Sequence, residues 1–171
     1  YHVIIEIGAG TGHYLARLLE ADAAAVGLAV DVSKAALRRA ARAHPRMAAV
    51  RADVWRGLPI ADGAAGLVLN VFAPRSGAEF ARILTPGGAV IVVTPEPGHL
   101  SELVSAAGMI AIDPAKQERL ATTLEAVPVA ARDLLELDSK PCESMLAVEF
   151  YDVAEDRIAE VLRLNLGLRT L

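Results

Sequence analysis

The stretch Val3–Gly12, with the sequence VIIEIGAGTG, decides the fold of this chain. Its β-branched residues predict a buried strand, and the alternating glycines that follow leave a turn whose backbone a ligand can approach. His13 to Glu20 carries Leu15, Leu18 and Leu19 at helical spacing, which predicts a helix after the turn. The free N–H groups at the start of such a helix favour a negative group. Strand, turn and helix together predict a nucleotide-type pocket.

The glycine spacing discriminates between cofactors. A dinucleotide-binding turn would read Gly-x-Gly-x-x-Gly, but the third glycine here comes one residue early and His13 occupies the expected place. The spacing therefore disfavours NAD. The alternative without any ligand is that the glycines form only a tight turn between strand and helix.

Glu6-x-Gly8-x-Gly10-x-Gly12 resembles motif I of the class I S-adenosylmethionine (SAM) methyltransferases. The resemblance implies that this loop wraps the methionine end of SAM and that Glu6 helps to order the loop. It also implies an α/β fold with a doubly wound, mostly parallel, Rossmann-like sheet of seven strands, the last of them antiparallel.

Composition indicates a single domain over residues 1–171. The chain has 54% hydrophobic and 22% charged residues, enough for one α/β core. No apolar run has membrane-spanning length, so we expect a soluble, cytoplasmic protein. The single cysteine, Cys142, excludes an internal disulfide or a cysteine zinc cluster, and we expect an ordinary thiol and no metal. Tyr1 almost abuts the first strand, so we expect a further module upstream.

Two acids follow the next predicted strands. Asp31 ends the apolar run Ala25 to Val30 and is predicted to bind the ribose hydroxyls. The alternative role, a helix N-cap, is assigned to Ser33. Asp53 follows a third strand, Met47 to Arg51, and resembles the methyltransferase residue that reads the adenine amine.

Beside Asp53, the resemblance makes Val54 the apolar wall of the adenine site. Trp55 could stack on the adenine, but a partly buried packing role is commoner for tryptophan.

The methyl acceptor is predicted to bind at the end of a fourth strand. Gly66 to Pro74 begins as a buried strand and ends with Asn70, Phe72 and Pro74 at the carboxyl edge, where α/β sheets bind ligands. Asn70, in a loop that stays exposed without substrate, would orient an amine-like or lactam nitrogen, and Phe72 would stack on a planar base. The alternatives are a core phenylalanine and a turn-forming asparagine.

Several segments resemble the large-subunit rRNA guanine-N1 methyltransferases, a family with macrolide-resistance members. They are Asn70–Pro74, Glu79–Gly88, Val92–Pro95 with His99–Leu103, and Asp113–Leu120. That family also carries an N-terminal zinc module with four cysteines, which this chain lacks, and a longer final strand region. Near the end we expect a sixth strand at Met145–Tyr151 and a helix at Ala154–Leu164.

The charge distribution leaves two interpretations of the second helix. The net charge is −4, yet Lys34, Arg38 and Arg42 share one helix face. This face is either simply solvated or faces RNA.

The leading functional hypothesis, which the resemblance implies, is methyl transfer from SAM to N1 of a guanine in an rRNA hairpin. N1 lies on the Watson–Crick edge, so the base must be unpaired or flipped. The alternatives are a small-molecule SAM methyltransferase and a non-catalytic SAM-binding protein. Two Cys-x-x-Cys pairs upstream of Tyr1 would favour the RNA substrate.

Overall fold

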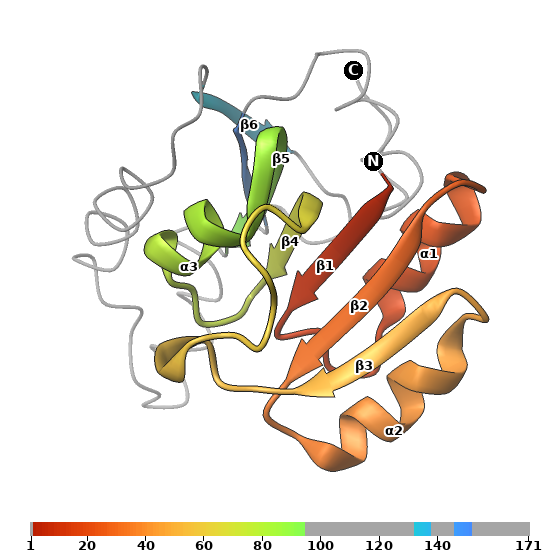
Figure 1. The fold of residues 1–171 in the computed structure, drawn as a ribbon. Coiled ribbons are helices and arrows are strands. Elements are labelled where there is room, and N and C mark those ends of the chain that lie inside the picture. The colour runs from red at the N-terminus through yellow and green to blue at the C-terminus, as the bar shows by residue number, and fades with distance from the viewer. Residues whose placement is uncertain (1, 95–131, 138–145, 152–171) are drawn as a thin grey trace, which may run out of the picture.

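The computed structural model describes residues 2–94, 132–137 and 146–151. Five parallel strands form the main part of the sheet: β1 (Val3–Ile7), β2 (Val26–Asp31), β3 (Met47–Arg51), β4 (Ala65–Val71) and β5 (Leu84–Thr94). They lie in the order β3-β2-β1-β4-β5 (Figure 1). The predicted doubly wound parallel architecture is confirmed for these strands.

Two further strands continue the sheet beyond β5. β7 (Leu146–Tyr151) pairs antiparallel with β5, and β6 (Arg132–Leu137) pairs antiparallel with β7. The predicted strand at Met145–Tyr151 is therefore present, but it follows β6 in the chain, which the sequence analysis missed. The predicted helix at Ala154–Leu164, Cys142, and the family-like segments between His99 and Leu120 lie outside the described residues.

The helices cover both faces of the sheet. On one face, α1 (His13–Ala21) and α2 (Lys34–Ala43) pack on alternate strand residues that include Ile4 and Leu67. On the other face, α3 (Gly77–Ile83) and the short 3-10 helix η1 (Val54–Arg56) pack on Ile5 and Val68. Side chains of successive strand residues point to opposite faces, so runs of consecutive apolar residues supply both cores.

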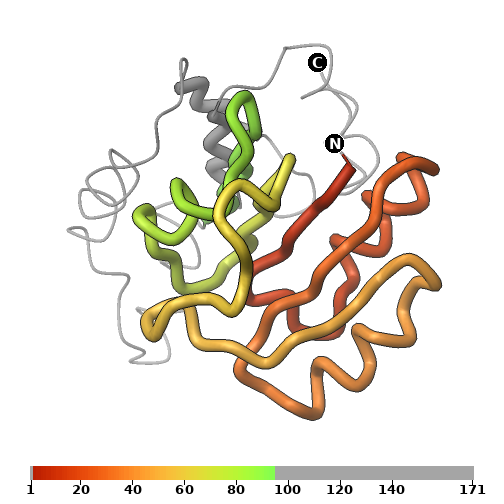
Figure 2. Tube along the Cα trace, in the orientation of Figure 1, coloured from red at the N-terminus to blue at the C-terminus, as the bar shows by residue number. Residues whose placement is uncertain are grey.

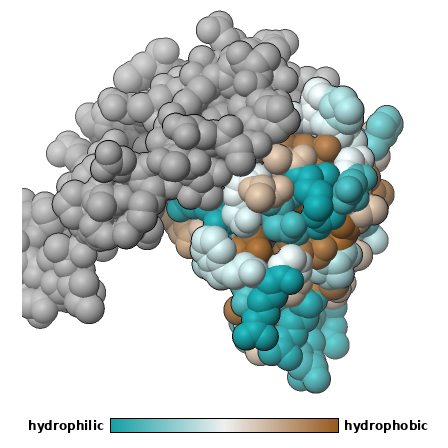
Figure 3. Space-filling model, turned by 60° about the vertical axis from the view of Figure 1, so that its left-hand side comes forward, coloured by the Kyte–Doolittle hydropathy of each residue, from teal (hydrophilic) through white to brown (hydrophobic). Residues whose placement is uncertain are grey.

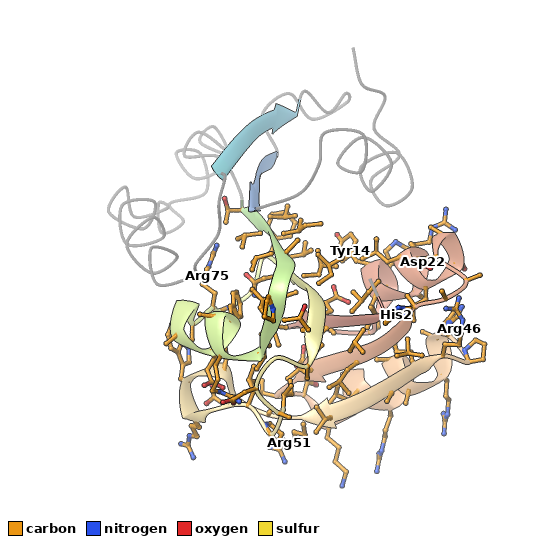
Figure 4. All side chains as sticks on the ribbon, turned by 45° about the horizontal axis from the view of Figure 1, so that its top comes forward. His2, Tyr14, Asp22, Arg46, Arg51 and Arg75 are labelled. Carbon is orange, nitrogen blue, oxygen red and sulfur yellow. The ribbon has the colours of Figure 1, made fainter. Side chains whose placement is uncertain are left out.

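Burial of one face and a cation at its end stabilise α1. Leu15 and Leu19 of α1 are fully buried, and each contributes about 1.5–3 kcal/mol through burial. At the end of α1 the Arg46 guanidinium donates to the carbonyl oxygens of Leu19, Asp22 and Ala25. Figure 4 shows Arg46 beside Asp22 at this corner. A cation there satisfies carbonyls that have no partner within the helix.

The chain returns to the middle of the sheet after β3. The tube in Figure 2 shows this path from β3 to β4. It leaves β1 between β2 and β4. The strand order reverses at β1 and β4, and ligands of open α/β sheets bind at this kind of switch point, outside the carboxyl ends of the strands.

Among the described helices, none is long and apolar enough to cross a membrane.

An ion-pair network fastens the connection between η1 and β4 to α3. The Glu79 carboxylate accepts from the Leu58 N–H at 2.6 Å and from Arg82 Nε and Nη2 at 2.9 and 2.8 Å. Arg82 also donates to the Ile60 carbonyl and to the Asp62 carboxylate, both at 2.7 Å. The hydrogen bonds from Arg82 lower the pKa of Glu79 from 4.5 to about 2.

We expect Glu79→Gln to lower the free energy of unfolding at pH 7 by about 1–3 kcal/mol, because it removes a charge-assisted hydrogen-bond acceptor. A lowered folded pKa contributes stability that is complete above the unfolded value, near 4.5, and is lost as the pH falls toward about 2. The difference between wild type and variant should therefore shrink over that interval. Denaturant unfolding at several pH values measures it.

The matched control is Asp62→Asn, which removes the charge of the other acidic partner of Arg82. Because the Asp62 side chain is 81% exposed, its ion pair should add little stability. A Glu79→Gln difference that is constant from pH 7 to pH 2 would contradict this interpretation.

Candidate active site

The predicted site residues converge on the carboxyl edge of the sheet. The glycine turn follows β1, Asp31 ends β2, Asp53 follows β3, and Asn70 and Phe72 lie at the end of β4. Glu6 and Val54 are buried beneath this edge instead. The topology thus brings together residues that are up to 66 positions apart in the chain, from Glu6 to Phe72.

The three glycines of the turn all have positive φ but serve different purposes. A Cβ on Gly8 would lie 2.2 Å from the Cβ of Ala73, and one on Gly12 would lie 2.9 Å from Met47 Sδ. Side chains at these two positions would collide with the protein itself. Gly10 differs, since nothing lies within 4 Å of its Cβ position. The open space over Gly10 leaves the backbone accessible to a ligand.

Asp31 ties the glycine turn to the beginning of α2. Its Oδ2 accepts from the Gly10 N–H and its Oδ1 accepts from the Ser33 N–H, both at 2.8 Å. Ser33 is the N-cap of α2, as predicted, because its Oγ accepts from the Ala36 N–H at 3.3 Å. A carboxylate can accept about four hydrogen bonds, so Asp31 retains capacity for ribose hydroxyls.

Glu6 lies under the turn and is only 1% exposed. Its Oε2 accepts from the Leu15 N–H, in the first turn of α1, at 3.2 Å. Burial raises the pKa of Glu6 from 4.5 to about 8; the Leu15 hydrogen bond opposes the rise and the negative charge of Asp31 adds to it. This contact orders the start of α1, and a direct contact between Glu6 and SAM stays a prediction.

The adenine end of the predicted site lies around η1. Asp53 caps this turn, since its Oδ1 accepts from the Trp55 N–H at 3.0 Å. Val54 is buried in the core on the α3 face. The packing role considered for Trp55 is wrong, because its side chain is 66% exposed. Asp53 and Val54 as adenine contacts stay predictions.

Asn70 corrects one expectation. The side chain was predicted to lie in an exposed loop, but it is fully buried. Its Nδ2 donates to the carbonyl oxygens of Ile7 at 3.2 Å and Pro74 at 3.0 Å. Asn70 therefore joins the end of β1 to the loop after β4, and its replacement by alanine should destabilise the fold. The amide oxygen, Oδ1, is buried and has no hydrogen-bond partner among the described residues.

Phe72 combines exposure with backbone strain. Half of its surface is exposed, so the alternative of a core residue is wrong. Its φ of 50° makes it the only non-glycine residue with positive φ among those described. The Phe72 N–H donates to the Val93 carbonyl at 3.0 Å, which fixes the backbone of Phe72 at the end of β5. A strained, exposed aromatic residue at a ligand-binding edge suggests a function.

Sequence reasoning missed the contact that couples the two halves of the site. Ala73 fills the place that a side chain on Gly8 would occupy, so the glycine turn and the loop after β4 pack directly on each other. Two small residues, far apart in the chain, were the only signal available.

Within the described residues, no group of three or more His, Cys, Asp or Glu side chains could hold a metal ion.

Comparison with known proteins defines the class of this domain. Residues 4–88 match the family model for a methyltransferase domain. A SAM-dependent methyltransferase from Mesorhizobium loti superposes with a TM-score of 0.63, covering 86% of this chain and 88% of that chain at 16% identity. Residues 4–88 therefore belong to a methyltransferase domain, and the cofactor of this class is SAM.

Two curated proteins are more similar to this chain in sequence. The 23S rRNA (guanine(748)-N(1))-methyltransferase of Streptomyces fradiae is 55% identical over 121 residues, which are 71% of this chain and 43% of the relative. A protein of Micromonospora griseorubida, provisionally named for guanine-N1 methylation of 23S rRNA, is 55% identical over 122 residues, or 71% of this chain and 41% of the relative. The chain thus spans less than half the length of either curated relative.

A valine at Gly10 should abolish SAM binding, because the side chain would fill the open space over the turn. A second glycine provides a matched control. Gly87, at the beginning of β5, also has positive φ and nothing within 4 Å of its Cβ position. Both substitutions cost about 1–2 kcal/mol in backbone strain, but only Gly10→Val should lose the cofactor. Calorimetric titration with SAM on both folded variants distinguishes them, and equal SAM affinity would contradict the assignment.

Proposed function

We propose that this protein methylates N1 of a guanine in 23S rRNA, using SAM. The observation that carries the proposal is the 55% identity over 121 residues with the Streptomyces fradiae enzyme. The aligned length exceeds the 85 residues from 4 to 88 that match the general domain. An rRNA substrate implies that the protein acts in the cytoplasm.

The reaction requires alignment more than acid–base chemistry. SAM supplies a methyl group on a sulfonium; a bond forms from guanine N1 to the methyl carbon as the carbon–sulfur bond breaks, and the N1 proton leaves to solvent. The protein must hold a flipped base edge-on to the cofactor. The packing of the loop Asn70–Pro74 beside the glycine turn supports this role for the loop.

Asn70 and Phe72 divide that task in our proposal. The Asn70 amide is held through its nitrogen by two backbone carbonyls, so the oxygen has a fixed direction. We infer that this oxygen accepts from an N–H on the Watson–Crick edge of the guanine. Phe72, exposed and held by its N–H, provides the face on which the base stacks.

The proposal is tested with the full-length protein, tritiated SAM and 23S rRNA from a strain that lacks the gene, followed by mass spectrometry of the modified nucleoside. Label in 1-methylguanosine supports it. Label found only in small molecules of a cell extract, with none in rRNA, would instead establish a small-molecule methyltransferase.

We expect Phe72→Ala to leave SAM affinity nearly unchanged and to lower single-turnover methylation of rRNA by about 5- to 150-fold, the equivalent of 1–3 kcal/mol for loss of stacking on one base. Because the ring is half exposed, the melting temperature should change little. Phe72→Tyr, which retains an aromatic face, is the matched control and should retain most of the activity. A melting temperature and SAM affinity that fall together, with a normal rate per folded molecule, would exclude the stacking role.

A further inference from the structure

Positive charge is concentrated in one part of the chain. Residues 33–61 contain seven of the 17 Lys and Arg residues but only one of the 21 Asp and Glu residues, Asp53. The net charge of the whole chain is −4, so the remainder is strongly acidic. The molecule is therefore electrostatically polarised.

Two of these seven cations are held by several carbonyl oxygens or by a carboxylate. Arg46 donates to three carbonyl oxygens after α1, and Arg56 lies 3.6 Å from the Asp53 carboxylate. The other five define what we term the α2 basic surface: Lys34, Arg38, Arg39, Arg42 and Arg51. All five are exposed, and none forms an ion pair with an acid in the described part of the chain.

This arrangement opposes the stability of α2. Lys34, Arg38 and Arg42 are spaced i, i+4, and like charges at that spacing destabilise a helix. Lys34 also lies in the first turn, where the helix dipole disfavours a cation, and the first turn contains no acid. Packing explains only Leu37 and Ala40, which are the buried residues of α2. Only Arg42, in the last turn, is favoured by the helix dipole. The fold therefore does not account for Lys34, Arg38 and Arg39.

The α2 basic surface begins at the edge of the sheet that carries the candidate site. α2 starts three residues after Asp31, and Arg51 pairs in register with Asp31 at the end of β3. Arg51 is anchored by one hydrogen bond, from Nε to the Val32 carbonyl at 2.9 Å. In Figure 4, nitrogen-tipped side chains, Arg51 among them, extend outward on the side of β3 and α2. The lowest part of the surface in Figure 3, where α2 lies in Figure 1, is almost wholly hydrophilic.

The spacing suits a nucleic acid that also reaches the acceptor loop. β3 and β4 are three strand positions apart in the sheet, which is about 14 Å at about 4.8 Å per strand. One turn of B-form DNA is about 34 Å long, and a turn of A-form RNA duplex is of the same order. A hairpin of one turn is therefore long enough to place its phosphates on the α2 basic surface and a flipped base at Phe72.

We propose that the α2 basic surface binds the phosphate backbone of the RNA that carries the methyl acceptor. Unpaired, exposed Lys and Arg side chains in a row are the complement of a polyanion, and such contacts position the RNA without reading its sequence. This inference rests on the proposed rRNA substrate. It adds a docking surface on this domain itself, separate from the acceptor loop and from the predicted SAM contacts.

The test uses the full-length protein carrying Lys34→Glu, Arg38→Glu and Arg42→Glu together. Binding to a protein-free 23S rRNA transcript is measured at 50 and 200 mM salt, alongside methylation of the same transcript. Each phosphate contact contributes about 0.9 to the slope of log affinity against log salt. Loss of three contacts should therefore reduce the fourfold-salt effect on affinity by about 40-fold relative to wild type. SAM affinity should be unchanged.

The matched control is Lys34→Arg with Arg38→Lys and Arg42→Lys, which retains every charge and should retain the wild-type salt dependence. A neutral variant with glutamine at the three positions, which should show the same reduced slope, replaces the reversal variant if the latter has a lowered melting temperature.

Three results would overturn the proposal. If the reversal and neutral variants bind and depend on salt like a wild type that methylates the transcript, the docking surface is wrong and the proposed function stands. If the charge-retaining control is equally impaired, charge is not the cause. If the wild type neither binds nor methylates the transcript, the proposed function fails together with this inference.

Discussion

The candidate site depends on the carboxylate of Asp31. Its two oxygens accept from the N–H groups of Gly10 and Ser33, each at 2.8 Å, and so fasten the glycine turn to the first residues of α2. The N–H groups of Gly8, Ala9 and Gly12 donate to backbone carbonyls, whereas that of Gly10 depends on the Asp31 side chain. Because the Asp31 side chain bonds to both segments, the open backbone of Gly10 lies next to the remaining acceptor positions of the Asp31 carboxylate. In our proposal, the Asp31 carboxylate thus serves both the fold and the recognition of the cofactor.

In the other half of the site, too, a few contacts hold two separate segments together. Asn70 bonds the end of β1 and the loop after β4, and Ala73 packs against Gly8. The loop that we assign to the methyl acceptor is thereby held against the turn that we assign to the cofactor. In-line transfer requires such a fixed relation between donor and acceptor, because misalignment of about 1 Å can cost two orders of magnitude in rate.

Local patterns explain what could be predicted from the sequence. The apolar runs specified the parallel strands, and Ser33 marked the start of α2 because capping is a local interaction. The burial of Asn70 and the exposure of Trp55 could not be predicted. Asn70 is buried through a partner 63 residues away, and Trp55 is exposed because η1 directs Val54 rather than Trp55 to the core. Long-range packing decides such cases, and no periodicity records it.

The most direct test of this account is the affinity of SAM for Asp31→Asn, measured by calorimetry on the folded variant with Asp62→Asn as the control. Asparagine offers one acceptor oxygen in place of two, so it cannot serve both the backbone and the ribose hydroxyls. The account predicts a loss of about 1–3 kcal/mol in binding free energy for Asp31→Asn and no change for the exposed Asp62→Asn. Unchanged SAM affinity in a folded Asp31→Asn protein would contradict it, and the ribose contact would then have to lie elsewhere.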